Sequence, residues 1–169
     1  MPGSARTTTS AGAADEDLVR RISVAARARG LRLAVAESLT CGRISSLLGR
    51  GEAAADWYRG AVIAYDADVK FRVLRVTPGP VVTQQCAREM AHGVRHLLQA
   101  DVALAITGVG GPGPDEGCPA GTVHLAVVTA DGTHDVETCL DGDPADVVAS
   151  AATLALGELA ETCERSAAG

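Results

Sequence analysis

Short apolar runs of strand length alternate along this chain with segments of helical periodicity, and this alternation restricts the possible folds. We expect strands at residues 31–35, 60–65, 101–106, 121–129 and 133–140. We expect helices at residues 15–29, 43–48, 68–74, 84–99 and 143–163. Alternation of this kind predicts parallel pairing, whereas Asp131-Gly132 predicts a tight hairpin between the last two strands. The sequence therefore predicts an α/β fold, a three-layer α/β/α sandwich with a mixed, mostly parallel sheet.

The ends of these elements are marked by residues with specific backbone preferences. Gly30 is expected to end the first helix, and Thr83 is expected to cap the helix at 84–99. The stretch at 77–80, Thr-Pro-Gly-Pro, separates two helices. We expect a single domain over residues 15–165, preceded by a disordered tail over residues 1–14 that is rich in Ser, Thr, Ala and Gly.

The composition limits the kind of core and the kind of partner. Hydrophobic residues make up 47% of the chain but aromatic residues only 2%, so the core must consist of Ala, Val, Leu and Ile. A net charge of −6 disfavours nucleic acid and anionic membranes, and no apolar run reaches the roughly 20 residues of a membrane span. Five cysteines without a CxxC pair indicate free thiols in a reducing compartment. We expect a cytoplasmic protein with a small-molecule ligand, and neither nucleic acid nor membrane as a partner.

A polar loop between the first strand and the following helix is the first candidate site. Its sequence is Ala36-Glu37-Ser38-Leu39-Thr40-Cys41-Gly42. Loops in this position of α/β proteins hold nucleophiles and bind anions. Ser38 is therefore a candidate nucleophile, although the surroundings do not match the GxSxG elbow of the hydrolases. The alternative is structural: Ser38 hydrogen-bonds within the loop or caps the helix that starts near Gly42.

A lysine that follows the second predicted strand is the candidate base. Lys70 lies between Val69 and Phe71, which favours its burial, and Tyr65 precedes it by five residues. A lysine accepts a proton from serine only when burial lowers its pKa, and the nearby carboxylates of Asp66 and Asp68 oppose that change. The spacing leaves the balance between these two effects open.

Two further motifs have simpler explanations. Gly108-x-Gly110-x-x-Gly113 follows a strand, but prolines lie within it and the next element is a strand, which excludes a dinucleotide-binding turn. This loop either presents backbone N–H groups to an anion or carbonyl, or is a flexible turn. His92 and His96 share a helix face without a third ligand nearby, so we expect no metal site.

Three motifs in order give the chain a resemblance to a known family. They are the segment 36–42, the run from Arg59-Gly60 to Tyr65 with Lys70 beyond it, and Thr107-Gly108-Val109-Gly110-Gly111-Pro112 followed by 119–123, Pro-Ala-Gly-Thr-Val. The chain resembles, over about residues 15–163, the CinA C-terminal domain family. Characterised members of that family are nicotinamide mononucleotide amidohydrolases, also called deamidases. The resemblance implies a fold like that of anticodon-binding domains.

The resemblance also implies a reaction and a set of site residues. Nicotinamide mononucleotide and water would give nicotinate mononucleotide and ammonia, with Ser38 as nucleophile and Lys70 as base and proton donor. Tyr65 would relay or orient the proton, backbone N–H groups at 40–42 would stabilise the oxyanion, and neither metal nor organic cofactor would be needed. Residues implied to bind substrate are Glu37, Thr40, Cys41, Gly42, Arg59, Thr107, Gly108, Gly111 and Thr122.

The chain departs from the family motifs at several positions. Cys41 stands where the family has glycine, and Pro144 stands where the family has an arginine, a side chain suited to phosphate. Two other functions therefore remain: an amidase for another small carboxamide, and a non-catalytic binding or assembly module. The sequence also allows a homodimer formed through apolar, aromatic-poor helices such as 147–159.

Overall fold

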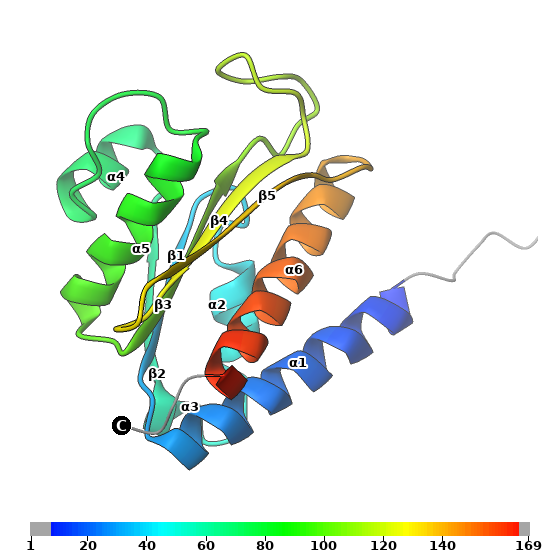
Figure 1. Cartoon of the computed structure of the whole chain (residues 1–169). Coiled ribbons are helices and arrows are strands. Elements are labelled where there is room, and N and C mark those ends of the chain that lie inside the picture. Colours follow the sequence, from blue (N-terminus) through cyan, green and yellow to red (C-terminus); the bar gives the residue numbers. More distant parts are fainter. Residues whose placement is uncertain (1–7, 166–169) are drawn as a thin grey trace, which may run out of the picture.

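The computed structural model describes residues 8–165; residues 1–7 and 166–169 are not described. A five-stranded sheet with the order β2-β1-β3-β4-β5 forms the middle of the molecule (Figure 1). β1 (Leu33–Glu37) pairs in parallel with β2 (Tyr58–Ile63) on one side and β3 (Val102–Gly108) on the other. β4 (Thr122–Val128) runs antiparallel to both β3 and β5 (Thr133–Cys139). Four of the five strands therefore run in the same direction and β4 runs against them, so the sheet is mixed and mostly parallel in strand direction, as the sequence predicts.

Helices cover both faces of this sheet and complete the three layers (Figure 1). One face carries α1 (Thr8–Arg29), α2 (Arg43–Leu48) and α6 (Pro144–Arg165). The other face carries α4 (Ala67–Val73) and α5 (Gln84–Leu98). A short helix, α3 (Ala54–Trp57), leads into β2. None of the described helices combines the length and the apolar character needed to cross a membrane.

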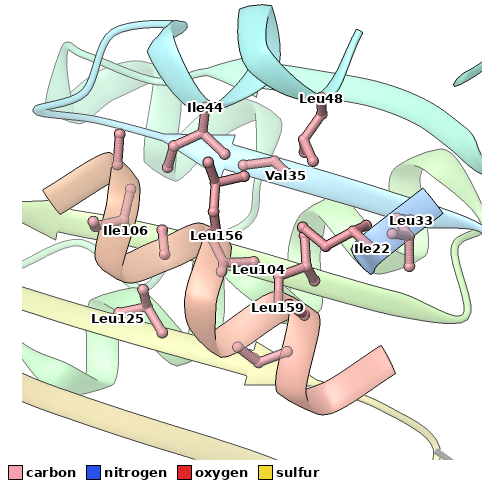
Figure 2. Close-up of a cluster of buried hydrophobic side chains, with 14 of the residues drawn as sticks. Ile22, Leu33, Val35, Ile44, Leu48, Leu104, Ile106, Leu125, Leu156 and Leu159 are labelled. Carbon is pink, nitrogen blue, oxygen red and sulfur yellow. The ribbon is translucent and has the colours of Figure 1, made fainter. Parts of the chain in front are cut away.

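The two faces of the sheet differ in side-chain size because large and small residues alternate along the strands. On the α1/α6 face the strands contribute branched side chains, among them Leu33, Val35, Leu104, Ile106 and Leu125 (Figure 2). On the α5 face the same strands contribute mainly alanines: Ala34, Ala36, Ala103, Ala105 and Ala126. Every second residue of a strand points to the same face, so this alternation fills both faces at once.

The small side chains and a glycine let α4, α5 and the sheet pack closely. A Cβ atom added at Gly93 of α5 would overlap the backbone carbonyl of Leu74, directly after α4. Gly93 directly follows His92, the first of the two histidines of α5, and this close approach explains the glycine at that position. Both histidines line an open groove on the outer side of α5, together with Arg75 and Arg95.

Several predicted boundaries are confirmed by the hydrogen bonds at the helix ends. The Thr83 hydroxyl accepts a hydrogen bond from the Cys86 N–H at 3.0 Å and caps α5. Gly30 follows α1 with a φ of 64°, a left-handed conformation that favours glycine.

One prediction near the N-terminus is wrong, and one short helix was missed. The disordered tail predicted for residues 1–14 is instead helical from Thr8 onward, and residues 1–7 lie outside the described part of the chain. A helix that is anchored by packing extends into neighbouring residues at little cost, and Asp15 adds an anchor by accepting a hydrogen bond from Thr153 of α6 at 2.6 Å. The short helix α3 was not predicted; its Trp57 is buried and donates to the Glu52 carbonyl at 3.0 Å.

Candidate active site

A cavity of about 450 Å³ lies at the carboxyl end of the parallel strands. β1 and β3 pair in register and end at this edge, so the loops that follow them meet here. The loop after β3 and the start of α6 lie at the same end of the sheet in Figure 1. Residues from five segments line the cavity: Ser38; Tyr65 and Lys70; Val81 and Val82; Thr107, Gly108 and Gly111; and Pro144 with Val148. The structure thus brings the three predicted catalytic residues to one cavity.

The turn between β1 and α2 is held by a buried carboxylate. Glu37 is fully buried, and its two oxygens accept hydrogen bonds from the N–H groups of Gly42 at 3.0 Å, Ile44 at 3.2 Å and Ser45 at 2.7 Å. These donors are the otherwise unpaired N–H groups at the start of α2, and a negative charge is favourable at that end of a helix. The Glu37 carboxylate therefore holds this turn, and Glu37 is not among the described residues that line the cavity.

Because Glu37 caps α2, Ser38 is free of that task. Its side chain is buried apart from 7% of its surface and lines the cavity, and no described residue hydrogen-bonds its hydroxyl. The Ser38 backbone is fixed on both sides: its N–H donates to Ile106 at 3.1 Å, and its carbonyl accepts from Cys41 at 3.0 Å. The structural alternative for Ser38, a helix cap, is therefore wrong.

Free backbone donors lie beside Ser38, and of the predicted donors at 40–42 only the Thr40 N–H is among them. The Gly42 N–H is taken by Glu37, and the Cys41 N–H by the Ser38 carbonyl. Among the described residues, the N–H groups of Leu39 and Thr40 have no hydrogen-bond acceptor. The Thr40 hydroxyl is also buried without a partner among these residues. Donors for an oxyanion are therefore available one and two residues after the candidate nucleophile.

Lys70 is a buried amine with a single described hydrogen bond. Its side chain is 1% exposed, and its Nζ donates to the Tyr65 carbonyl oxygen at 3.1 Å. Burial lowers the pKa of Lys70, and the charges of Cys86, Asp66 and Glu116 oppose this effect without reversing it. Asp68 forms an ion pair with Arg72 at 3.3 Å. The sequence could not decide between burial and the nearby carboxylates, and in the structure burial dominates.

Tyr65 lines the cavity with an exposed ring and holds Lys70 through its backbone. The side chain is 69% exposed, so the phenol lies at the rim of the cavity. The hydrogen bond to Lys70 uses the Tyr65 carbonyl, which any residue at this position would supply. The backbone between β2 and α4, rather than the Tyr65 phenol, therefore orients the Lys70 amine.

Sequence reasoning missed the loop that covers the cavity. Val81 and Val82, which follow the Thr-Pro-Gly-Pro stretch, line the cavity, and both N–H groups donate to one carboxylate oxygen of Glu116 at 2.8 Å. The Val81 carbonyl accepts a hydrogen bond from the Thr107 hydroxyl at 2.9 Å. Thr107 therefore holds the covering loop as well as lining the cavity. The two apolar residues directly after Thr-Pro-Gly-Pro are the only sequence signal that this loop lines the cavity.

The glycine-rich loop after β3 approaches its neighbours closely. A Cβ atom at Gly108 would overlap the Thr122 carbonyl oxygen, and Gly111 has a φ of 88°. Both glycines line the cavity, so the backbone itself forms this wall. The sequence left open whether this loop presents backbone N–H groups to a ligand or is a flexible turn, and this observation favours the first interpretation.

Six of the nine residues expected to bind substrate lie outside the cavity lining: Glu37, Thr40, Cys41, Gly42, Arg59 and Thr122. Arg59 precedes Gly60, which pairs with Ala34 near the start of β1, so it lies toward the opposite end of the sheet and donates to the Leu98 carbonyl at 3.1 Å. The Thr122 hydroxyl donates to Pro119 at 2.8 Å. Cys41 is an exposed free thiol with a φ of 45°, and Gly42 follows it in a left-handed conformation with a φ of 94°.

Comparison with known proteins decides the family. The CinA C-terminal domain family matches residues 15–163. The chain belongs to this family. A CinA-like protein of Gloeobacter violaceus is 41% identical over 131 residues, which cover 73% of this chain and 31% of that protein. A CinA-like protein of Frankia casuarinae is 37% identical over 137 residues, with 78% and 32% covered. The chain thus spans about a third of the length of these curated relatives.

Solved structures of the CinA superfamily share the whole domain. The competence damage-inducible protein A of Klebsiella pneumoniae subsp. pneumoniae MGH 78578 has a TM-score of 0.86 and 34% identity, covering 89% of this chain and 98% of that one. The competence/damage inducible protein of Agrobacterium tumefaciens has a TM-score of 0.81 and 30% identity, covering 86% and 93%. The α/β fold is therefore that of the CinA superfamily.

Proposed function

We propose that this protein is a serine amidohydrolase that releases ammonia from a small carboxamide. The observation that carries the proposal is the separation of tasks at the β1–α2 turn. Glu37 caps the helix with three hydrogen bonds, while Ser38 presents a free hydroxyl to a cavity that also contains the buried Lys70. A non-catalytic module has no need for a buried amine and an unused hydroxyl in the same cavity.

The lowered pKa of Lys70 supports its role as the base. A neutral amine takes the proton of Ser38 while the serine oxygen attacks the amide carbon. The tetrahedral intermediate collapses, the C–N bond breaks, and the Lys70 ammonium returns the proton to the departing ammonia. Water then attacks the acyl ester, with Lys70 again accepting a proton, and releases a carboxylate and free Ser38.

Backbone donors near Ser38 are available for the charge that develops in this reaction. The N–H groups of Leu39 and Thr40, the two residues after Ser38, have no acceptor among the described residues, and an oxyanion hole would use such donors. Removing one such donor from a hydrolase costs roughly 3 to 4 kcal/mol of transition-state stabilisation. These donors belong to the backbone, so side-chain substitution leaves them in place.

The carboxamide implied by the family resemblance is that of nicotinamide mononucleotide. In that reaction the nicotinamide amide becomes a carboxylate, and the products are nicotinate mononucleotide and ammonia. Such an activity would place the protein in pyridine nucleotide salvage. The pyridinium ring of this compound is positively charged, and its phosphate is negatively charged, so the two ends make different demands on the cavity.

Ammonia release is the direct test of the amidohydrolase. The parent protein and the Ser38→Ala and Lys70→Ala variants are assayed with nicotinamide mononucleotide and with a panel of unphosphorylated carboxamides. We expect release by the parent and a loss of at least roughly 10³-fold in each variant, because nucleophile and base act together. Cys41→Ser is the matched control and retains activity, since its side chain lies outside the cavity. A folded parent that releases no ammonia from any compound would reject the proposal.

A further inference from the structure

The start of α6 forms one wall of the cavity, and its backbone donors are already occupied. Pro144 lines the cavity and has no N–H group. The N–H groups of Ala145 and Asp146 donate to the Asp143 carboxylate at 2.9 and 3.0 Å, and the Val147 N–H donates to the Asp143 carbonyl at 2.9 Å. The start of a helix ordinarily attracts anions through such free donors. Here the protein's own carboxylate takes that place.

The charges around the cavity are unfavourable for a negatively charged group such as a phosphate. Asp115 lines the cavity from the loop after β3, and Asp143 lies directly before Pro144. Among the described residues that line the cavity, Lys70 is the only one with a basic side chain. Lys70 is buried, and its Nζ is bonded to the Tyr65 carbonyl. This amine is used for the reaction, so it is not a free partner for a distant phosphate.

We propose that the substrate of this site is a carboxamide without a phosphate group, either uncharged or positively charged. The proposal rests on the amidohydrolase function proposed above. A phosphate that extended toward α6 would approach Asp143 without a guanidinium or a free helix N–H to bind it. Like charges held close together in a partly desolvated cavity oppose binding, whereas a cationic ring beside Asp115 is stabilised.

The glycine loop is the feature that competes with this inference. Gly110, Gly111 and Gly113 line the cavity with backbone alone, and consecutive N–H groups of a loop can bind a phosphate. If these groups bind phosphate more strongly than the carboxylates repel it, a phosphorylated substrate is preferred. The experiment must therefore compare the same carboxamide with and without its phosphate.

Nicotinamide riboside and nicotinamide mononucleotide form that pair. We expect the parent protein to hydrolyse the riboside with a kcat/KM roughly tenfold or more above that for the mononucleotide, since about 1.4 kcal/mol of repulsion is sufficient. Pro144→Arg should raise the relative kcat/KM for the mononucleotide by roughly tenfold, because a guanidinium binds phosphate with two hydrogen bonds. Pro144→Ala is the matched control and should leave the ratio of the two kcat/KM values unchanged.

Each result separates the substrate class from the activity. Hydrolysis of the mononucleotide at an equal or higher kcat/KM overturns the phosphate-free substrate and leaves the amidohydrolase intact. If the folded parent hydrolyses neither compound nor any other carboxamide, the proposed activity fails, and calorimetric titration of Ser38→Ala with both compounds decides the preference. Tighter binding of the riboside then supports the inference; tighter binding of the mononucleotide, or binding of neither, overturns it.

Discussion

α2 and α6 both begin near the cavity, and at each of them a carboxylate of the chain occupies the free N–H groups. At α2 the carboxylate is Glu37, which reaches from the end of β1, is fully buried and accepts three hydrogen bonds. At α6 it is Asp143, which is exposed, lies directly before the helix and accepts two hydrogen bonds with its side chain. The same capping chemistry has different consequences at the two ends.

The difference lies in what each cap leaves free. Glu37 holds the β1–α2 turn so that the hydroxyl of Ser38 and the N–H groups of Leu39 and Thr40 remain available for a substrate. Asp143 leaves no free donor in the first turn of α6 and adds a negative charge near Pro144. The first cap therefore supports the proposed reaction, and the second restricts which substrates can bind.

The largest effect is expected at the buried cap. Glu37→Ala removes a charged acceptor from three buried or partly buried N–H groups, and we expect a loss of about 3 kcal/mol in the free energy of unfolding. Glu37→Gln keeps one acceptor oxygen and should lose about half as much. Urea unfolding measures both, with Ser38→Ala as a control of nearly parental stability. A Glu37→Ala protein as stable as the parent would remove the structural role of Glu37.

The pH dependence of the reaction is the next largest effect, and it concerns the reacting groups Ser38 and Lys70 rather than the start of α6. Because burial lowers the pKa of Lys70, the neutral amine increases with pH, and kcat/KM should rise roughly tenfold per pH unit below this lowered pKa and level off above it. Asp66 raises the pKa of Lys70 and also caps α4 through the Asp68 N–H. Asp66→Asn keeps a capping side chain and should shift the rising limb to lower pH.

A distant carboxylate provides the control for that shift. Asp17 forms an ion pair with Arg20 in α1, and Asp17→Asn should leave the rising limb where it is. Rates of the parent and both variants between pH 5 and 10 are sufficient for the comparison. A parent rate that does not change over this range would show that Lys70 is not the group that accepts the proton.

The smallest effect is expected at the exposed cap. Asp143→Ala should lower the free energy of unfolding by about 1 kcal/mol, the usual cost of losing a helix N-cap. Asp143→Asn keeps an acceptor and should stay within about 0.5 kcal/mol of the parent. Both losses, measured by urea unfolding, should be smaller than that of Glu37→Ala. An Asp143→Ala loss equal to that of Glu37→Ala would mean that burial does not distinguish the two caps.

Local sequence signals predicted most of the fold and the start of α6 to within one residue. Asp-Pro is a frequent start of a helix, and α6 begins at Pro144, one residue after the predicted boundary. The alternation of Leu, Ile and Val with Ala predicted the strands, because each of these residues expresses its preference within its own segment. α3 was missed because burial of Trp57 rather than local preference stabilises it, and the first turns of α1 were missed because they extend a helix that is anchored from Asp15 onward.

The sequence by itself determined the order of strands and helices, the family, and Ser38 and Lys70 as the residues to examine. These depend on local preference and on motifs that are contiguous in the chain. Only the tertiary structure decided that Glu37 caps α2, that Lys70 is buried, that Val81 and Val82 cover the cavity, and that Arg59 lies away from it. Hydrogen bonds and desolvation depend on which distant segments come together, and residue spacing alone does not specify those contacts.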